Sequence, residues 1–183
     1  MELNTNAISV RNNDLDIVRK LTQAKADANF KHKSWAGLSL IELASSDAIS
    51  ILIAANVCVN TSDTLLREPI LHAKCNQGNL EAVQSLISAN ADLNITNKYG
   101  QTALINVVEN RRIDPGIVLD TVRILIGARC DVRRADKNGN TALMIADKAG
   151  NEEVASAIFT QIQFVVKNIL KKLSVSLRQK KFL

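Results

Sequence analysis

The stretch NKYGQTALINV at residues 97–107, which returns as DKNGNTALMIA at residues 136–146, decides the fold of this chain. Gly100 and Gly139 hold the same place in the two copies, and a tight turn with positive φ is cheap only for glycine. Two residues after each glycine comes a threonine, a typical N-cap, because its hydroxyl accepts from the free N–H groups of a first helical turn. The pair predicts a unit in which a tight turn leads directly into an α-helix.

Weaker copies of this stretch occur earlier in the chain. SWAGLSLIELA at residues 34–44 keeps the glycine, whereas EPILHA at residues 68–73 lacks it. A second motif, an apolar helical run closed by a short segment such as NADLN, recurs about every 31 to 39 residues, at 25–29, 56–60, 90–94 and 129–133. Each period therefore holds two helices and a turn, which predicts a stacked array rather than one globular core.

The turn, the helix start and the closing segment together resemble the ankyrin repeat. The resemblance covers residues 6–160 and is strongest in the copies that begin at Asn97 and Asp136. It implies an all-α solenoid of helix–turn–helix units with short β-hairpin turns, about four to five repeats and a C-terminal helix. One ankyrin-repeat domain at 1–160 then consists of units at approximately 6–33, 34–62, 63–96, 97–135 and 136–160, and the remaining helix is at 161–183.

Two of these units depart from the usual length. The unit 34–62 is short, so we expect both of its helices to be clipped. The unit 97–135 is long, and Pro115-Gly116 places its extra residues in a loop between the helices. The crowded face between stacked helices is expected to hold the small residues Ala44, Ala73 and Ala146.

No pattern in the sequence carries catalytic chemistry. Phosphate-binding and dinucleotide-binding glycine motifs and the nucleophile elbow are all absent. The resemblance places His72 where ankyrin repeats hold a structural histidine, and Cys58, Cys75 and Cys130 show neither C-x-x-C nor metal-ligand spacing. We therefore expect no enzyme activity, no cofactor, no metal and no small-molecule substrate.

Cysteine usage and the lack of targeting segments bear on the compartment. The three cysteines are odd in number, which disfavours a disulfide framework and favours a reducing environment. We see no Sec-type signal peptide and no run of about 18 apolar residues that could span a bilayer. The expectation is a soluble, cytoplasmic protein.

The resemblance also implies where a partner binds. Ankyrin repeats usually contact other proteins through variable hairpin positions and the polar face of the first helix, both on the concave side. Matched residue by residue, the hairpin positions are Trp35, Leu65, Arg67, Lys98, Tyr99, Gln101, Lys137 and Asn138. The first-helix positions are Asn76, Gln77, Glu109, Asn110 and Lys148. Trp35 and Tyr99 are the only Trp and Tyr, and these types are favoured as interface anchors; the alternative for both is packing within the stack.

The last part of the chain has a different charge. All 18 acidic residues precede Thr160, and the bases beyond it are Lys167, Lys171, Lys172, Arg178, Lys180 and Lys181. Ile162, Val166 and Ile169 recur at helical spacing, which predicts an amphipathic helix. One interpretation is a helix that caps the last repeat; the other is attachment to an anionic membrane, an acidic partner or a calmodulin-like groove. Nucleic acid is not favoured, because few aromatic residues interleave with the bases.

These features favour a non-catalytic scaffold or adaptor that binds another protein on its concave face. The alternative is a peripheral membrane or regulatory protein that is targeted by its basic C-terminal helix. A third hypothesis is the substrate-recruiting part of an enzyme. The Asn-, Ile- and Lys-rich composition resembles ankyrin proteins of intracellular bacteria and large viruses, which adds a host-directed effector, secreted without a Sec-type signal peptide, to the expectations.

Overall fold

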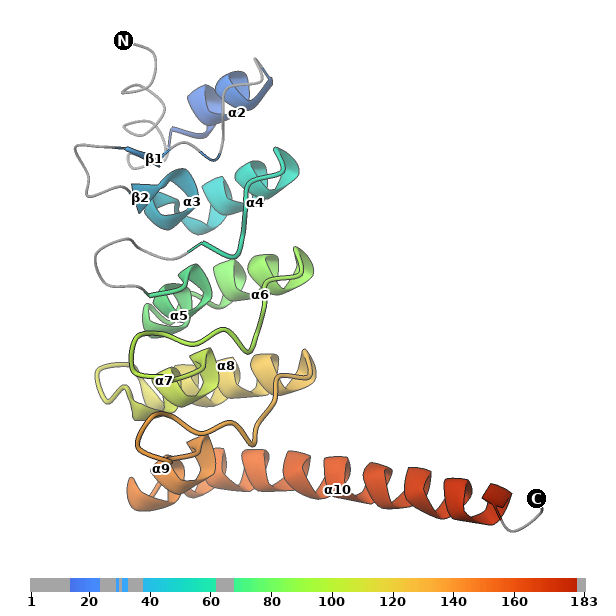
Figure 1. Ribbon diagram of the computed structural model, residues 1–183. Coiled ribbons are helices and arrows are strands. Elements are labelled where there is room, and N and C mark those ends of the chain that lie inside the picture. The colour runs from blue at the N-terminus through green and yellow to red at the C-terminus, as the bar shows by residue number, and fades with distance from the viewer. Residues whose placement is uncertain (1–13, 24–28, 30, 33–37, 62–67, 181–183) are drawn as a thin grey trace.

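The helices of this chain stack in layers along one axis, as the computed structural model shows (Figure 1). The structure describes residues 14–23, 29, 31–32, 38–61 and 68–180. In chain order its elements are α2 (Leu15–Gln23), β1 (Lys31–His32), β2 (Leu38–Ser39), α3 (Leu40–Leu43), α4 (Ser46–Ala54), α5 (Ile70–Asn76), α6 (Leu80–Ser88), α7 (Ala103–Glu109), α8 (Pro115–Gly127), α9 (Ala142–Lys148) and α10 (Glu152–Lys180).

The layers are built from two columns of helices. The first helices pack on one another in the order α5, α7, α9, and the second helices in the order α2, α4, α6, α8, α10. Within the layers, α5 contacts α6, α7 contacts α8 and α9 contacts α10. The buried aliphatic residues of both columns form one continuous core. The predicted all-α solenoid of helix–turn–helix units is therefore confirmed.

Short hairpins join consecutive layers and lie along one side of the stack, at the left of Figure 1. β1 and β2 pair antiparallel, with Lys31 opposite Ser39. In the last hairpin, Ala135 and Thr141 form an isolated antiparallel bridge. The predicted hairpin turns are thus present, although they are only two-residue strands or single bridges where the structure describes them.

The predicted turn and cap chemistry is found in the two strongest copies. Gly100 and Gly139 have φ of 77° and 82°. Thr102 accepts from the backbone N–H of Ile105 at 3.4 Å, and Thr141 accepts from Met144 at 3.3 Å. These local contacts fix where α7 and α9 begin, because each satisfies an N–H group that has no partner within the helix.

The predicted interhelical loop at Pro115-Gly116 is wrong. Both residues belong to the first turn of α8, whose N-cap is Asp114. The Asp114 carboxylate accepts from the N–H groups of Gly116 at 2.9 Å and Ile117 at 3.3 Å. Proline suits this place because the first helical N–H needs no partner and its φ is already helical. Much of the extra length of this unit therefore lengthens α8 to 13 residues.

In the short unit at 34–62, only the first helix is shortened, whereas the sequence predicts that both are short. α3 has 4 residues, whereas α4 has 9, the same length as α6. Only Ala44 and Ser45 lie between the two helices, because the Ser45 side chain accepts from the N–H of Ala48 and caps the start of α4.

Lys74, rather than Ala73, occupies the crowded place between layers in α5. Ala44 and Ala146 are buried there as predicted, but Ala73 is only half-buried and Lys74 is 4% exposed. The register follows from Pro69, which is the N-cap of α5. The Lys74 ammonium donates to the carbonyl of Ala44 at 2.8 Å, at the C-terminal end of α3. Burial lowers the pKa of Lys74 from its ordinary value.

His72 has the structural place that the sequence predicts. Its side chain is fully buried, and its Nε2 lies 3.0 Å from the carbonyl oxygen of Ile95 in the next hairpin segment. Because Nε2–H must donate to that carbonyl, Nδ1 carries the lone pair of a neutral ring, and Nδ1 has no partner. Burial lowers the pKa of His72, and the hydrogen bond with Ile95 opposes this only in part.

We expect the protein to lose stability as the pH falls through the ordinary histidine value of 6.5. Below that value the unfolded chain binds a proton that buried His72 refuses, so protonation favours unfolding. Melting temperatures at about pH 7.5 and about pH 5.5 measure this loss. His72→Gln keeps an N–H donor for Ile95 and should lose less over the same range. An equal loss in both proteins would contradict a neutral buried His72.

α10 runs without a break from Glu152 to Lys180 and therefore crosses the expected boundary at residue 160. Val154 and Ile158 of its first half are buried against the stack, whereas its second half extends beyond the other second helices (Figure 1). Residue 160 thus marks a change of charge rather than of backbone. No helix in the described part of the chain is long and apolar enough to cross a membrane.

Candidate protein-binding face

The tips of two consecutive hairpins meet in a small cluster of Lys98, Tyr99 and Lys137. The Lys137 backbone N–H donates to the Tyr99 carbonyl at 3.1 Å, and its ammonium donates to the Lys98 carbonyl at 2.7 Å. The Lys98 ammonium lies 5.1 Å from the centre of the Tyr99 ring, a cation–π distance. Tyr99 is nevertheless 58% exposed. The hairpins therefore hold an exposed aromatic ring that contacts the Lys98 ammonium, and Lys137 joins the two tips.

Beside these tips, a chain of amide and carboxylate groups crosses α5 and α7. Asn76 donates to Glu68 at 3.0 Å and to Asn106, and Asn110 donates to Asn76 at 3.3 Å. Asn106 and Asn97 both donate to the Gln101 side-chain oxygen, at 3.4 and 3.0 Å. Gln101 in turn donates to Glu109.

This network couples neighbouring layers, because the Asn76–Asn106 and Asn76–Asn110 bonds join α5 to the α7 unit. Each amide uses its N–H groups on another member of the chain, which fixes the side-chain rotamers. The exposed carboxylate of Glu109 and the half-buried one of Glu68 still have oxygens that can accept from a partner. The network is a preorganised polar surface rather than a set of mobile side chains.

We call the tip cluster and this network, together with the neighbouring exposed side chains, the hairpin face. The structure brings most of the predicted binding positions onto it. They are Asn76, Lys98, Tyr99, Gln101, Glu109, Asn110 and Lys137. Gln77, Asn138 and Lys148 are exposed nearby in the same hairpins and first helices. Trp35, Leu65 and Arg67 lie outside the described residues.

Gln101 plays a supporting part in this face. It is only 7% exposed, and its amide is held by Asn97, Asn106 and Glu109. Its side chain therefore positions Glu109 and offers little surface of its own to a partner.

Glu68, Asn97 and Asn106 belong to the network but were missed by the sequence prediction. Asn106 carried a detectable signal, because it stands at a half-buried helical position where α9 has Ile145. A polar residue at such a place needs a hydrogen-bonding partner. Glu68 gave no local signal, because its partner Asn76 lies on the far end of α5.

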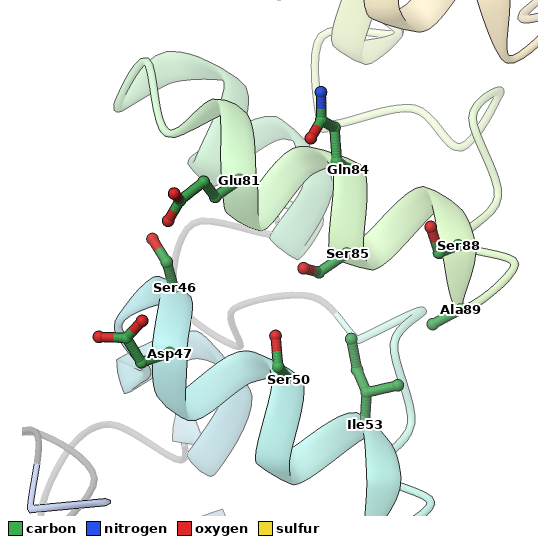
Figure 2. A pocket seen from close by; sticks show the side chains of 9 residues that line it. All are labelled: Ser46, Asp47, Ser50, Ile53, Glu81, Gln84, Ser85, Ser88 and Ala89. Carbon is green, nitrogen blue, oxygen red and sulfur yellow. The ribbon is translucent and has the colours of Figure 1, made fainter.

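A groove of about 520 Å³ opens between the second helices α4 and α6 (Figure 2). Its walls carry small polar side chains, and Ser50 faces Ser85 across it. Ser46 donates to Asn79 at 2.8 Å at one end. In the described part of the chain no group of three His, Cys, Asp or Glu side chains could hold a metal ion. Nothing in this groove assembles a nucleophile with a base.

The buried thiols are chemically quiet. Cys75 is fully buried, and desolvation raises its pKa to about 12. The pKa of the Cys130 thiol is raised to about 12, mainly by burial and in addition by the charge of Asp131. Cysteines of this kind react slowly, because the thiolate is the reactive form.

A family model of ankyrin repeats, in three copies, matches residues 70–168. The chain belongs to the ankyrin-repeat family. An ankyrin repeat protein of fowlpox virus (strain NVSL) is 24% identical over 163 residues, which is 85% of this chain and 46% of the viral protein. The BRCA1-associated RING domain protein 1 of Caenorhabditis elegans is 31% identical over 110 residues, which is 60% of this chain and 15% of the nematode protein. The chain thus spans less than half the length of either relative.

Ankyrin repeats are general protein–protein interaction modules and are typically non-catalytic.

The predicted anionic-surface contacts of this ankyrin-repeat chain lie on α10. Lys167, Lys171 and Lys172 are exposed. The side chains of Arg178 and Lys180, and the whole of Lys181, lie outside the described part of the chain.

Proposed function

We propose that this ankyrin-repeat chain is a non-catalytic scaffold that binds another protein on the hairpin face. The observation that carries the proposal is the tip cluster, in which Tyr99 is exposed, its ring contacts Lys98, and its backbone is held by Lys137. A rigid aromatic side chain loses little entropy on binding and can bury a large area, so such residues dominate many interfaces. The layered fold holds the cluster in place.

The charges of the hairpin face suggest the chemistry of the partner. Lys98 and Lys137 make the tips cationic, whereas Glu68 and Glu109 make the adjoining network anionic. An acidic segment of the partner protein would lie along the tips, and a basic or amide-bearing side chain would reach the network. The proposal therefore includes electrostatic complementarity as well as a central aromatic contact.

Compartment and biological setting are parts of the proposal. Cys58, Cys75 and Cys130 are free thiols, as a reducing compartment allows, and we propose that the protein works in a cytoplasm. We also propose a host-directed effector as one setting; the fowlpox virus relative shows only that a similar ankyrin-repeat chain occurs in a virus.

Tyr99→Ala should weaken capture of the partner about tenfold or more, because it removes the aromatic anchor. The measurement is affinity capture from a eukaryotic lysate over a range of bait concentrations, with the half-maximal concentration compared between variants. Phe164→Ala is the matched control, because Phe164 is an aromatic residue that is 59% exposed but lies on α10, among the second helices. If Tyr99→Ala and Lys137→Ala both captured every protein as well as the wild type, the hairpin face would not be the site.

A second candidate function is peripheral attachment to an anionic surface through α10. It is favoured by the exposed lysines Lys167, Lys171 and Lys172 and by the absence of any acidic residue after Glu153. Long-range attraction of this kind is weakened by salt, so attachment should fall steeply between low and high ionic strength.

A further inference from the structure

The end of the stack exposes apolar side chains that the inner layers cover. Met144 is the third residue of α9, and the third residues of α5 and α7, His72 and Ile105, are buried under the following layer. Phe159 of α10 corresponds in position to Ile126 of α8. Ile126 is half-buried. Met144 and Phe159 are instead 57% and 51% exposed. Both therefore lie on the outer side of the last layer.

The apolar surface continues along the projecting half of α10. Val166 and Leu170 follow Phe159 at intervals of seven and four residues, which places all three on one side of the helix. Val166 is 47% exposed and Leu170 is 61% exposed. We call Met144, Phe159, Val166 and Leu170 the end stripe.

The charges along the projecting half of α10 are all of one sign, whereas Asp147 and Glu152 are exposed near Met144 and Phe159. Lys167, Lys171 and Lys172 lie on the rest of the α10 circumference, and Glu153 is the last acidic residue of the chain. A helix with an apolar side and lysines around it suits the headgroup region of a bilayer, where the apolar side enters the acyl boundary. Lysine stems can reach back to the phosphates while the apolar side is buried.

We propose that the end stripe lies in the surface of an anionic lipid membrane, with α10 parallel to the bilayer. This inference rests on the second candidate function, attachment through α10. It specifies that the anionic surface is a lipid bilayer and that the end stripe enters it. Lipid fits better than a second copy of the chain, because pairing two α10 helices would bring their lysines together without any acid beyond Glu153.

The local shape also favours lipid over a partner helix. A cavity of about 400 Å³ at the root of the projecting half is lined by residues such as Arg129, Phe164 and Lys172. Phe164 is offset from the end stripe around α10, so this cavity is not part of the stripe. The α10 part of the stripe is the convex side of a single helix, which a bilayer can cover without a matching groove.

Flotation of the full chain with lipid vesicles tests the proposal. Vesicles that contain roughly a quarter phosphatidylserine should bind the protein, and neutral phosphatidylcholine vesicles should not. Leu170→Gln should lower the partition coefficient at least tenfold, as expected for one leucine kept from the acyl region. Phe164→Gln is the matched control, because Phe164 is 59% exposed on the same helix but outside the stripe, and it should change binding less than about twofold. Lys167→Gln with Lys172→Gln should lower binding about thirtyfold at low salt. Circular dichroism checks that each variant keeps its helix.

The outcomes separate this inference from the function on which it rests. If Leu170→Gln bound anionic vesicles as well as the wild type, or if Phe164→Gln were equally weakened, insertion of the end stripe would be wrong and charge alone would account for attachment. If the wild type did not float with anionic vesicles at all, both the inference and the second candidate function would be wrong. A dimer in light scattering that Leu170→Gln dissociates, without flotation, would assign the stripe to a second copy.

Discussion

Leu86→Ala is expected to lower the free energy of unfolding by about 2–5 kcal/mol, because it leaves a cavity in a fully packed layer. Leu86 lies in α6 at the middle of the stack and is 0% exposed. Each layer of a solenoid contacts only its neighbours, so the loss falls on the interfaces that α6 makes. The substitution should therefore weaken the packing of α6 on the layers at its two sides, and with it the stability of the complete stack.

Urea denaturation followed by circular dichroism measures this loss. Ile87→Ala is the matched control, because Ile87 is the next residue of α6 and is only half-buried. It should cost clearly less than Leu86→Ala. Equal losses of unfolding free energy for the two variants would contradict the burial of Leu86 inside the stack.

Gly100→Ala is expected to destabilise the fold by about 2–4 kcal/mol, of which the positive φ accounts for about 1–2 kcal/mol. The φ of Gly100 is 77°, and a Cβ there would lie 2.9 Å from Cγ and 3.1 Å from the backbone N of Lys137. The Lys137 side chain can move, but its backbone N–H donates to Tyr99. Relief of the contact therefore has to separate the two hairpin tips.

Gly139→Ala is the control for this prediction. Gly139 has φ of 82°, yet nothing lies within 4 Å of the Cβ that alanine would add. It should show the cost of the positive φ without the collision, and it should leave partner capture unchanged. Gly100→Ala should weaken both thermal stability and capture. A smaller effect at Gly100 than at Gly139 would mean that the tips do not touch.

The layered fold was predictable because its decisive signals are local. Turn glycines, threonine caps and the apolar spacing of each helix lie within a dozen residues of one another. The register of α5 was not, because no glycine marks its hairpin and Pro69 acts as the N-cap in place of a threonine. A shift of one residue there exchanges Ala73 for Lys74 in the buried place.

The hairpin face was predictable as a set of positions but not as a set of contacts. Tyr99 was recognisable by residue type and by its place in a hairpin. Its contact with Lys137 depends on how two layers, 38 residues apart in the chain, sit on each other. The burial of Gln101 likewise depends on Asn106 and Glu109 from α7.

Only part of the structure of α10 could be predicted from the sequence. Its amphipathic spacing and its charge are properties of the sequence. Whether the helix folds back over the last layer or projects from it depends on the geometry at Gln161 and beyond, where α10 passes the end of α8 (Figure 1).

The central claim is that a partner protein binds the hairpin face around Tyr99. Site-specific photo-crosslinking tests it most directly, with a photoreactive amino acid at position 99 in one variant and at Ser50, in the groove of the second helices, in another. Both side chains are exposed, so reactivity alone does not favour either. We predict a discrete crosslinked protein from position 99 and none from position 50. A discrete product from position 50 with none from position 99 would contradict the claim.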